Sequence, residues 1–128
     1  MGSGRLITFA LAVGLLAVSM PGFAHHGQVE YESKAITLKG TVTKFEWTNP
    51  HCILGVAVKN EKDNVEEWYA EILPPNRMTR AGWTQEIIKP GDEVTLVGRP
   101  GKQGAHIMWL EYVVLADGRK LKRDSGAR

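Results

Sequence analysis

The sequence contains a single cysteine, Cys52, and only four histidines among its 128 residues. One cysteine excludes an internal disulfide framework, and it also excludes zinc and iron–sulfur sites that need several thiolates. The charge is nearly balanced, with 16 basic and 14 acidic residues. That balance is unfavourable for a protein that binds nucleic acid mainly through its phosphates. Because histidine is scarce, the positions of the four residues are more informative than their number.

Sequence motifs of common catalytic sites are also absent. The sequence has no G-x-S-x-G, H-E-x-x-H, phosphate-binding or dinucleotide-binding motif. His51 and Cys52 are neighbours, and on a regular strand their side chains point to opposite faces, so they do not form a nucleophile pair. Glu71 has the chemistry of a general base, but a single carboxylate on a half-exposed strand is usually solvated. We therefore expect a protein that is not an enzyme.

The first 24 residues have the features of a secretory signal peptide. Arg5 precedes an apolar or small-residue run from Leu6 to Met20, and a small-residue end follows at Ala24. The run is shorter than the roughly 18 apolar residues of a membrane-spanning helix, and Pro21 would interrupt such a helix. The sequence thus predicts cleavage near Ala24, a periplasmic or secreted mature chain that begins at His25, and no stable membrane anchor. An uncleaved N-terminal anchor is the alternative.

The mature chain divides into an N-terminal arm at 25–34, a β domain at 35–121 and a flexible tail at 122–128. The arm has no hydrophobic periodicity, which is typical of a mobile or loosely docked segment. In the β domain, apolar and polar side chains alternate between turn dipeptides, and this pattern predicts strands. We expect strands at Ala35–Trp47, Cys52–Val58, Val65–Leu73, Glu93–Arg99 and Ala105–Leu115, and a short one at Lys120–Leu121. Gly40 within the first strand predicts a bulge or a sharp coil.

A short helical insert separates the third and fourth expected strands. The spacing predicts a helix over Asn76–Ala81, with Pro75 near its start and Gly82 at its C-terminal cap, and a further helical turn from Trp83 to Ile88. Three strands, a helical connection and two strands are the element order of an OB-fold barrel. The predicted fold class is therefore all-β with a short helical insert, an OB-fold-like five-stranded barrel. An open β-sandwich is the alternative.

The histidines near the predicted cleavage site suggest metal chemistry. Cleavage after Ala24 would make His25 the N-terminal residue, so that its amine and imidazole can chelate one metal ion, and His26 adds an amide and a second imidazole. Such a nitrogen set suits Cu(II). His51, where a strand enters the barrel, is the candidate to complete the site, and His106 is a weaker one. Imidazoles bind metals in their neutral form, so affinity should fall as the pH drops toward the ordinary histidine pKa of about 6.5.

Aromatic and basic residues permit a different interpretation. Trp47 and Trp83, with Arg80, could line a groove for a protein or saccharide partner, as on many OB-fold barrels. Alternatively the tryptophans belong to the core and Arg80 to a solvated face. In the same way, His25 and His26 are either metal ligands or part of a flexible leader.

Several motifs of the mature chain together resemble a family of small exported bacterial proteins of unknown function. The resemblance rests on Ala24-His25-His26, Leu38-Lys39-Gly40-Thr41-Val42, the T-N-P-H motif within Glu46-Trp47-Thr48-Asn49-Pro50-His51, Trp68 with Glu71, Arg80-Ala81-Gly82-Trp83-Thr84, Lys89-Pro90-Gly91-Asp92 and Asp117-Gly118-Arg119. It supplies no activity. It implies that His25, His26, His51 and Glu71 belong to the family pattern, whereas His106 and Cys52 do not.

Two hypotheses about function follow. The first is a periplasmic protein that binds copper or another transition metal through His25, His26 and His51, with Glu71 as a fourth ligand or as a group that orients a ligand. The second is a non-catalytic module that binds a periplasmic protein or a saccharide and no metal. The two differ in one geometric requirement, because a shared site requires His51 to lie within reach of the N-terminal arm.

Overall fold

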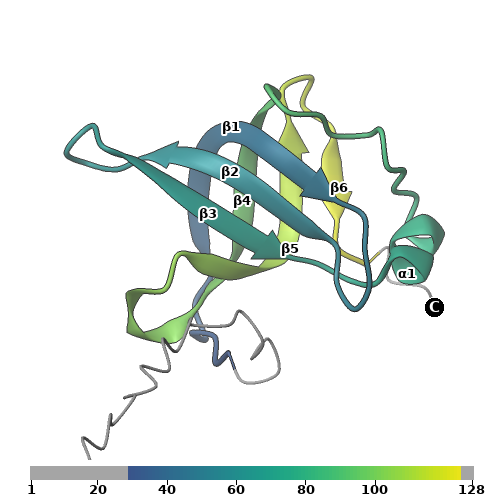
Figure 1. Ribbon diagram of the computed structural model, residues 1–128, viewed down its shortest axis with the longest axis horizontal. Helices are drawn as coiled ribbons and strands as arrows, with labels where there is room; N and C mark the ends of the chain where they lie inside the picture. The colour runs from purple at the N-terminus through teal and green to yellow at the C-terminus, as the bar shows by residue number, and fades with distance from the viewer. Residues whose placement is uncertain (1–28, 125–128) are drawn as a thin grey trace, which may run out of the picture.

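The structure, a computed structural model, describes residues 29–124. The predicted signal peptide, His25, His26 and the last four residues lie outside this range. The described elements, shown in Figure 1, are β1 (Ile36–Glu46), β2 (Ile53–Lys59), β3 (Val65–Glu71), α1 (Pro75–Arg80), β4 (Glu93–Pro100), the short 3-10 helix η2 (Lys102–Gly104), β5 (Ile107–Leu115) and β6 (Lys120–Lys122). Within the described range, no helix has the length and apolar character needed to cross a membrane.

The strands close into a barrel. Antiparallel pairs join β3 to β2, β2 to β1, β1 to β4 and β4 to β5, and a parallel pairing between β3 and β5 completes the circle. β6 pairs antiparallel with residues Tyr112 to Val114 of β5, beyond the residues that pair with β3. This is a mostly β protein with a closed five-stranded, OB-fold-like barrel, so the predicted fold class is confirmed. The open sandwich is wrong, because the β3–β5 pairing links what would be the two free edges.

β1 pairs with both halves of the barrel, and Gly40 lies where it passes from one to the other. Gly40 is paired with β2 and β4 at the same time. A Cβ atom at this position would lie 2.3 Å from the carbonyl oxygen of Ala57, so only glycine allows the two strands to approach this closely. The bulge lies elsewhere, between Val42 and Lys44, where the β1–β2 register shifts. The prediction of a bulge at Gly40 is therefore wrong in position, whereas the coiling of the long strand is present.

α1 and the turn that follows it close one end of the barrel (Figure 1). Met78, Trp83 and Ile88 are buried against the strands. The indole N–H of Trp83 donates a hydrogen bond to the carbonyl oxygen of Lys122 at 2.9 Å. This bond links the turn after α1 to β6. α1 agrees with the predicted helix to within one residue, and Gly82 follows it with a φ of 89°. The second helical turn is present only as a hydrogen-bonded turn, without a helix.

The described part of the N-terminal arm is hydrogen-bonded to the barrel. The backbone N–H of Glu32 donates to Pro100, and that of Lys102 donates to Glu30, both at 2.8 Å, on either side of a bridge between Tyr31 and Gly101. The arm segment and the loop after β4 lie side by side in Figure 1. From residue 29 onward, the arm is therefore docked on the barrel.

Cys52 is fully buried in the core. Burial raises the pKa of its thiol, which lowers the thiolate fraction at neutral pH. We expect a thiol reagent such as iodoacetamide to leave Cys52 unmodified in the folded protein at about pH 8 and to modify it rapidly in denaturant. Mass spectrometry of the labelled protein measures both. Rapid, complete labelling of the folded protein would contradict this burial.

Candidate metal centre

The seam where β3 meets β5 carries a row of side chains that includes the candidate ligand Glu71. The parallel register places Glu71 beside Trp109, and the neighbouring antiparallel registers place Ile53 beside Glu71 and Arg99 beside Trp109. Directly paired residues share a face of a sheet. Ala70, next to Glu71, points into the core, so the row lies on the outer face of the barrel.

A small pocket lies at one end of this row. Its volume is about 200 Å³, and it is lined by Thr48, Asn49, Pro50, His51, Ile53 and Glu71. His51 comes from the loop before β2, whereas Glu71 is the last residue of β3. The structure thus brings together the two candidate ligands that it describes, although they are separated in the sequence by most of a β-hairpin.

Glu71 is buried, with only 7% of its surface exposed. The hydroxyl of Tyr31 donates a hydrogen bond to Glu71 Oε2 at 2.6 Å. Burial, together with the neighbouring Glu71 carboxylate, raises the pKa of Tyr31 well above its ordinary value, so the phenol stays a donor throughout the physiological range. The expectation that Glu71 lies on a solvated face is wrong, because the N-terminal arm reaches over it.

Trp109 on β5 contacts the N-terminal arm, the loop before β2 and the segment after β6. Its ring centroid lies 6.1 Å from that of Tyr31 and 5.7 Å from that of His51, the latter in an edge-to-face arrangement. The guanidinium of Arg123 lies 4.8 Å from the centroid of the same ring. Tyr31 and Arg123 were not candidates from the sequence, and Trp109 was considered only for a ligand-binding groove or for the core, because the register that gathers the three residues joins segments far apart in the chain.

His106 lies in a different environment. Its ring stacks on Trp68 with centroids 4.9 Å apart, and its Nε2 atom lies 3.6 Å from Glu66 Oε2. It does not line the pocket of His51 and Glu71. Because His106 lies outside this pocket, it is a suitable control residue for His51.

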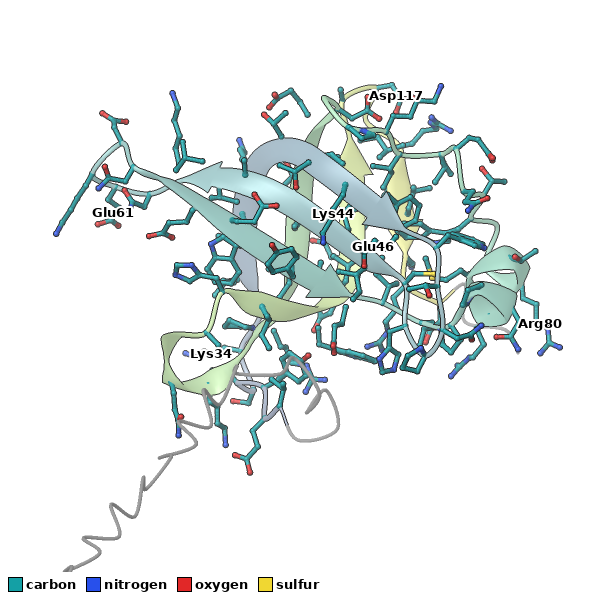
Figure 2. The ribbon with its side chains drawn as sticks, in the orientation of Figure 1. Lys34, Lys44, Glu46, Glu61, Arg80 and Asp117 are labelled. Carbon is teal, nitrogen blue, oxygen red and sulfur yellow. The ribbon has the colours of Figure 1, made fainter. Side chains whose placement is uncertain are left out.

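The residues proposed for a partner-binding groove do not form one surface. Trp83 is buried in the core, 2% exposed. Trp47 is half-buried and packs edge-to-face on Phe45, with centroids 5.9 Å apart. Arg80 is exposed on α1, and Figure 2 shows its side chain pointing away from the barrel. The structure therefore places Trp83 in the core and Arg80 on a solvated face.

Residues 29–124 do not by themselves show a metal site built from three or more of the usual ligand side chains. No group of three or more His, Cys, Asp or Glu side chains within that range is arranged to hold a metal ion. His51 and Glu71 offer one nitrogen and one carboxylate, whereas stable transition-metal sites generally use three or four protein ligands.

The architecture defines a small, closed β-barrel protein of the OB-fold type, with the described part of its N-terminal arm docked on the barrel and a small pocket at the seam. Over residues 12–108 the sequence matches a family of unknown function (DUF6152), and the chain belongs to this family. The predicted membership of an uncharacterised family is thus confirmed. No curated protein sequence matches the chain.

Proposed function

We propose that the protein is an exported copper-binding protein whose site combines His25 and His26 of the arm with His51 and Glu71 of the barrel. One observation carries the proposal. Tyr31 of the arm donates a hydrogen bond to Glu71, and Glu71 lines the same pocket as His51. A position of His51 at the opposite end of the barrel would have excluded a shared site.

The length of the chain supports a shared site. His26 precedes Tyr31 by five residues, and five residues of extended chain span at most about 17 Å. The rings of Tyr31 and His51 both lie close to Trp109, at 6.1 Å and 5.7 Å between centroids. A chain of this length therefore allows the proposed ligands His25 and His26 to meet the His51 imidazole.

The available donors favour copper over harder cations. Cleavage near Ala24 would give His25 a free amine, and the two adjacent histidines then supply several nitrogen donors on one short segment. Cu(II) prefers such nitrogen sets and is first in the affinity order of the divalent metals. The buried carboxylate of Glu71 adds negative charge in a poorly solvated pocket, where its attraction for a cation is stronger than in water.

The test is a Cu(II) titration of mature protein whose N-terminus has been verified by mass spectrometry. We expect one Cu(II) per chain, a visible absorption band and a higher melting temperature, because a ligand that binds only the folded state stabilises it. His51→Ala should weaken binding by about tenfold or more, since even groups outside the ligand shell contribute 10–100-fold. His106→Ala is the matched control and should bind like the wild type.

Two outcomes would overturn the proposal. Binding no tighter than that of the denatured chain would exclude a folded copper site and would favour a metal-free binding module. Equal affinity of the wild type and His51→Ala would show that His51 is not a ligand and that the site is not the one proposed.

A further inference from the structure

We propose that the outer face of the barrel wall formed by β1, β4, β5 and β6 binds an acidic polysaccharide through a cluster of lysines and arginines. These four strands are neighbours in the sheet (Figure 1). We call this surface the basic face. Its cations are Lys39 on β1, Arg99 on β4, Lys120 and Lys122 on β6, and Arg123 directly after β6. None of these residues is a proposed copper ligand, so the inference does not depend on the proposed function.

The strand registers place these cations on one side of the sheet. Directly paired residues share a face of a sheet, and the pairings define three rows across the wall. The rows are Lys39 with Thr95, Val114 and Lys120; Thr37 with Val97, Tyr112 and Lys122; and Arg99 with Trp109. Leu96 and Val113, which alternate with these residues, are buried in the core. The rows therefore lie on the outer surface of the barrel.

Aromatic rings hold two of the cations in place. The Nζ atom of Lys120 lies 3.8 Å from the ring centroid of Tyr112, and the guanidinium of Arg123 lies 4.8 Å from that of Trp109. Such cation–π contacts attract the charge to the ring. Because these side chains are already ordered, less conformational freedom is lost when an anion binds to them.

The charge of the basic face is not neutralised by the described part of the chain. Among residues 29–124, none of the five cations forms an ion pair with a carboxylate. The Nε and Nη1 atoms of Arg123 are buried and have no hydrogen-bond acceptor among these residues. Glu93 and Glu111 border the face, and Glu93 already accepts a hydrogen bond from the Thr41 hydroxyl at 2.6 Å. The face is thus positive, although the whole chain has a formal net charge of only +2.

Protection of a sheet edge explains only part of this cluster. Lysines on a terminal strand commonly prevent pairing with the edge of another sheet. Lys120 and Lys122 lie on β6, which is last in the strand order, and they fit that role. Lys39 and Arg99 do not, because β1 and β4 each have a neighbouring strand on both sides. The cluster as a whole therefore indicates an anionic ligand.

A hollow on the same face has the lining that a sugar unit needs. Its volume is about 270 Å³, and Lys39, Thr95 and Val114 of the first row line it, with Glu93 at its border. Ligand sites combine apolar lining with a few polar groups that fix orientation. The Thr95 hydroxyl and the Lys39 amine can hydrogen-bond to sugar hydroxyls and carboxylates, while Val114 packs on the C–H groups of the ring.

The exposure of the apolar side chains argues against other anionic partners. Val97, Tyr112 and Val114 are half-buried, and among the described residues the exposed large hydrophobic side chain is Val65 on β3. Membrane surfaces and protein partners are usually bound through apolar or aromatic anchors. Nucleic-acid bases stack on open aromatic rings, whereas the rings of Trp109 and Tyr112 carry cations. A hydrophilic polyanion built from sugars fits the face best.

The experiment measures binding of a fluorescein-labelled alginate oligosaccharide by fluorescence anisotropy, with EDTA present so that copper plays no part. We expect saturable binding that weakens as the salt concentration rises, and no binding to a neutral dextran of equal length. The triple variant Lys39→Gln/Lys120→Gln/Lys122→Gln should bind about tenfold more weakly, since each exposed ion pair contributes a few-fold. Thr95→Tyr, which fills the hollow without changing the charge, should also weaken binding.

The matched control is Lys59→Gln/Lys62→Gln/Arg80→Gln, which removes the same charge from exposed residues of the β2–β3 hairpin and α1. It should bind like the wild type, and the melting temperatures of all variants should show that each is folded. An equal loss in both triple variants would show a response to net charge alone and would overturn the inference. Equal binding of alginate and dextran would do the same. Tighter binding to anionic lipid vesicles or to single-stranded DNA than to alginate would show that the assigned partner is wrong.

Discussion

Replacing both His25 and His26 with alanine should reduce the Cu(II) affinity of the mature protein by more than about a hundredfold. Each imidazole is proposed as a direct ligand, and direct ligands contribute at least as much as the 10–100-fold typical of groups outside the ligand shell. His51 and Glu71 remain in the double variant, but two donors do not make a stable site. Competition with a chelator gives the ratio of the two dissociation constants.

The same double variant should keep the fold. Both substitutions precede the described residues, which include all the strands of the closed barrel, so we expect the melting temperature without copper to equal that of the wild type. The gain in melting temperature that copper gives the wild type should disappear in the double variant. Tight, one-to-one binding by the double variant would show that the arm histidines are not the ligands.

Gly40→Val should prevent the barrel from closing. The added Cβ would lie 2.3 Å from the Ala57 carbonyl oxygen and 2.6 Å from a methyl carbon of Val56, and both are fixed within β2. Because Gly40 pairs with β2 and β4 together, β1 cannot move away from one strand without losing the other. The loss in free energy of unfolding should exceed about 4 kcal/mol, in the range of the most damaging single substitutions.

Thermal unfolding followed by circular dichroism measures this effect. Thr37→Val is the control, since Thr37 is an exposed residue of the same strand and valine is favoured in strands. Its melting temperature should stay near that of the wild type. A cooperative transition of Gly40→Val at the wild-type temperature would show that β1 does not need the close approach at this residue.

The fold could largely be predicted from the sequence because its determinants are local. Alternating side chains predict each strand, and Pro75 and Gly82 bracket α1, so the helix is placed to within one residue. The bulge was misplaced because a glycine indicates a close approach of the backbone, whereas the register shift between Val42 and Lys44 depends on how β1 pairs with β2.

The candidate site could be predicted only in part. His51 and Glu71 were candidates, and the structure places both at one pocket. Tyr31 was missed, and Trp109 was considered only as a groove or core residue, because their contacts depend on the β3–β5 register and on the docking of the arm, neither of which leaves a local pattern. The burial of Glu71 was missed for the same reason, since alternation along β3 correctly places it on the outer face but does not show that the arm covers it.

The central claim is that one metal ion is shared by the arm and the barrel. Cu(II) is paramagnetic and broadens the NMR signals of nuclei close to it, so a titration with less than one equivalent locates the ion directly. The account predicts that the side-chain signals of His51 and Trp109 broaden first, while those of His106 and Trp68 remain sharp. Broadening confined to the arm, or broadening of His106 as strong as that of His51, would contradict a site shared with this pocket.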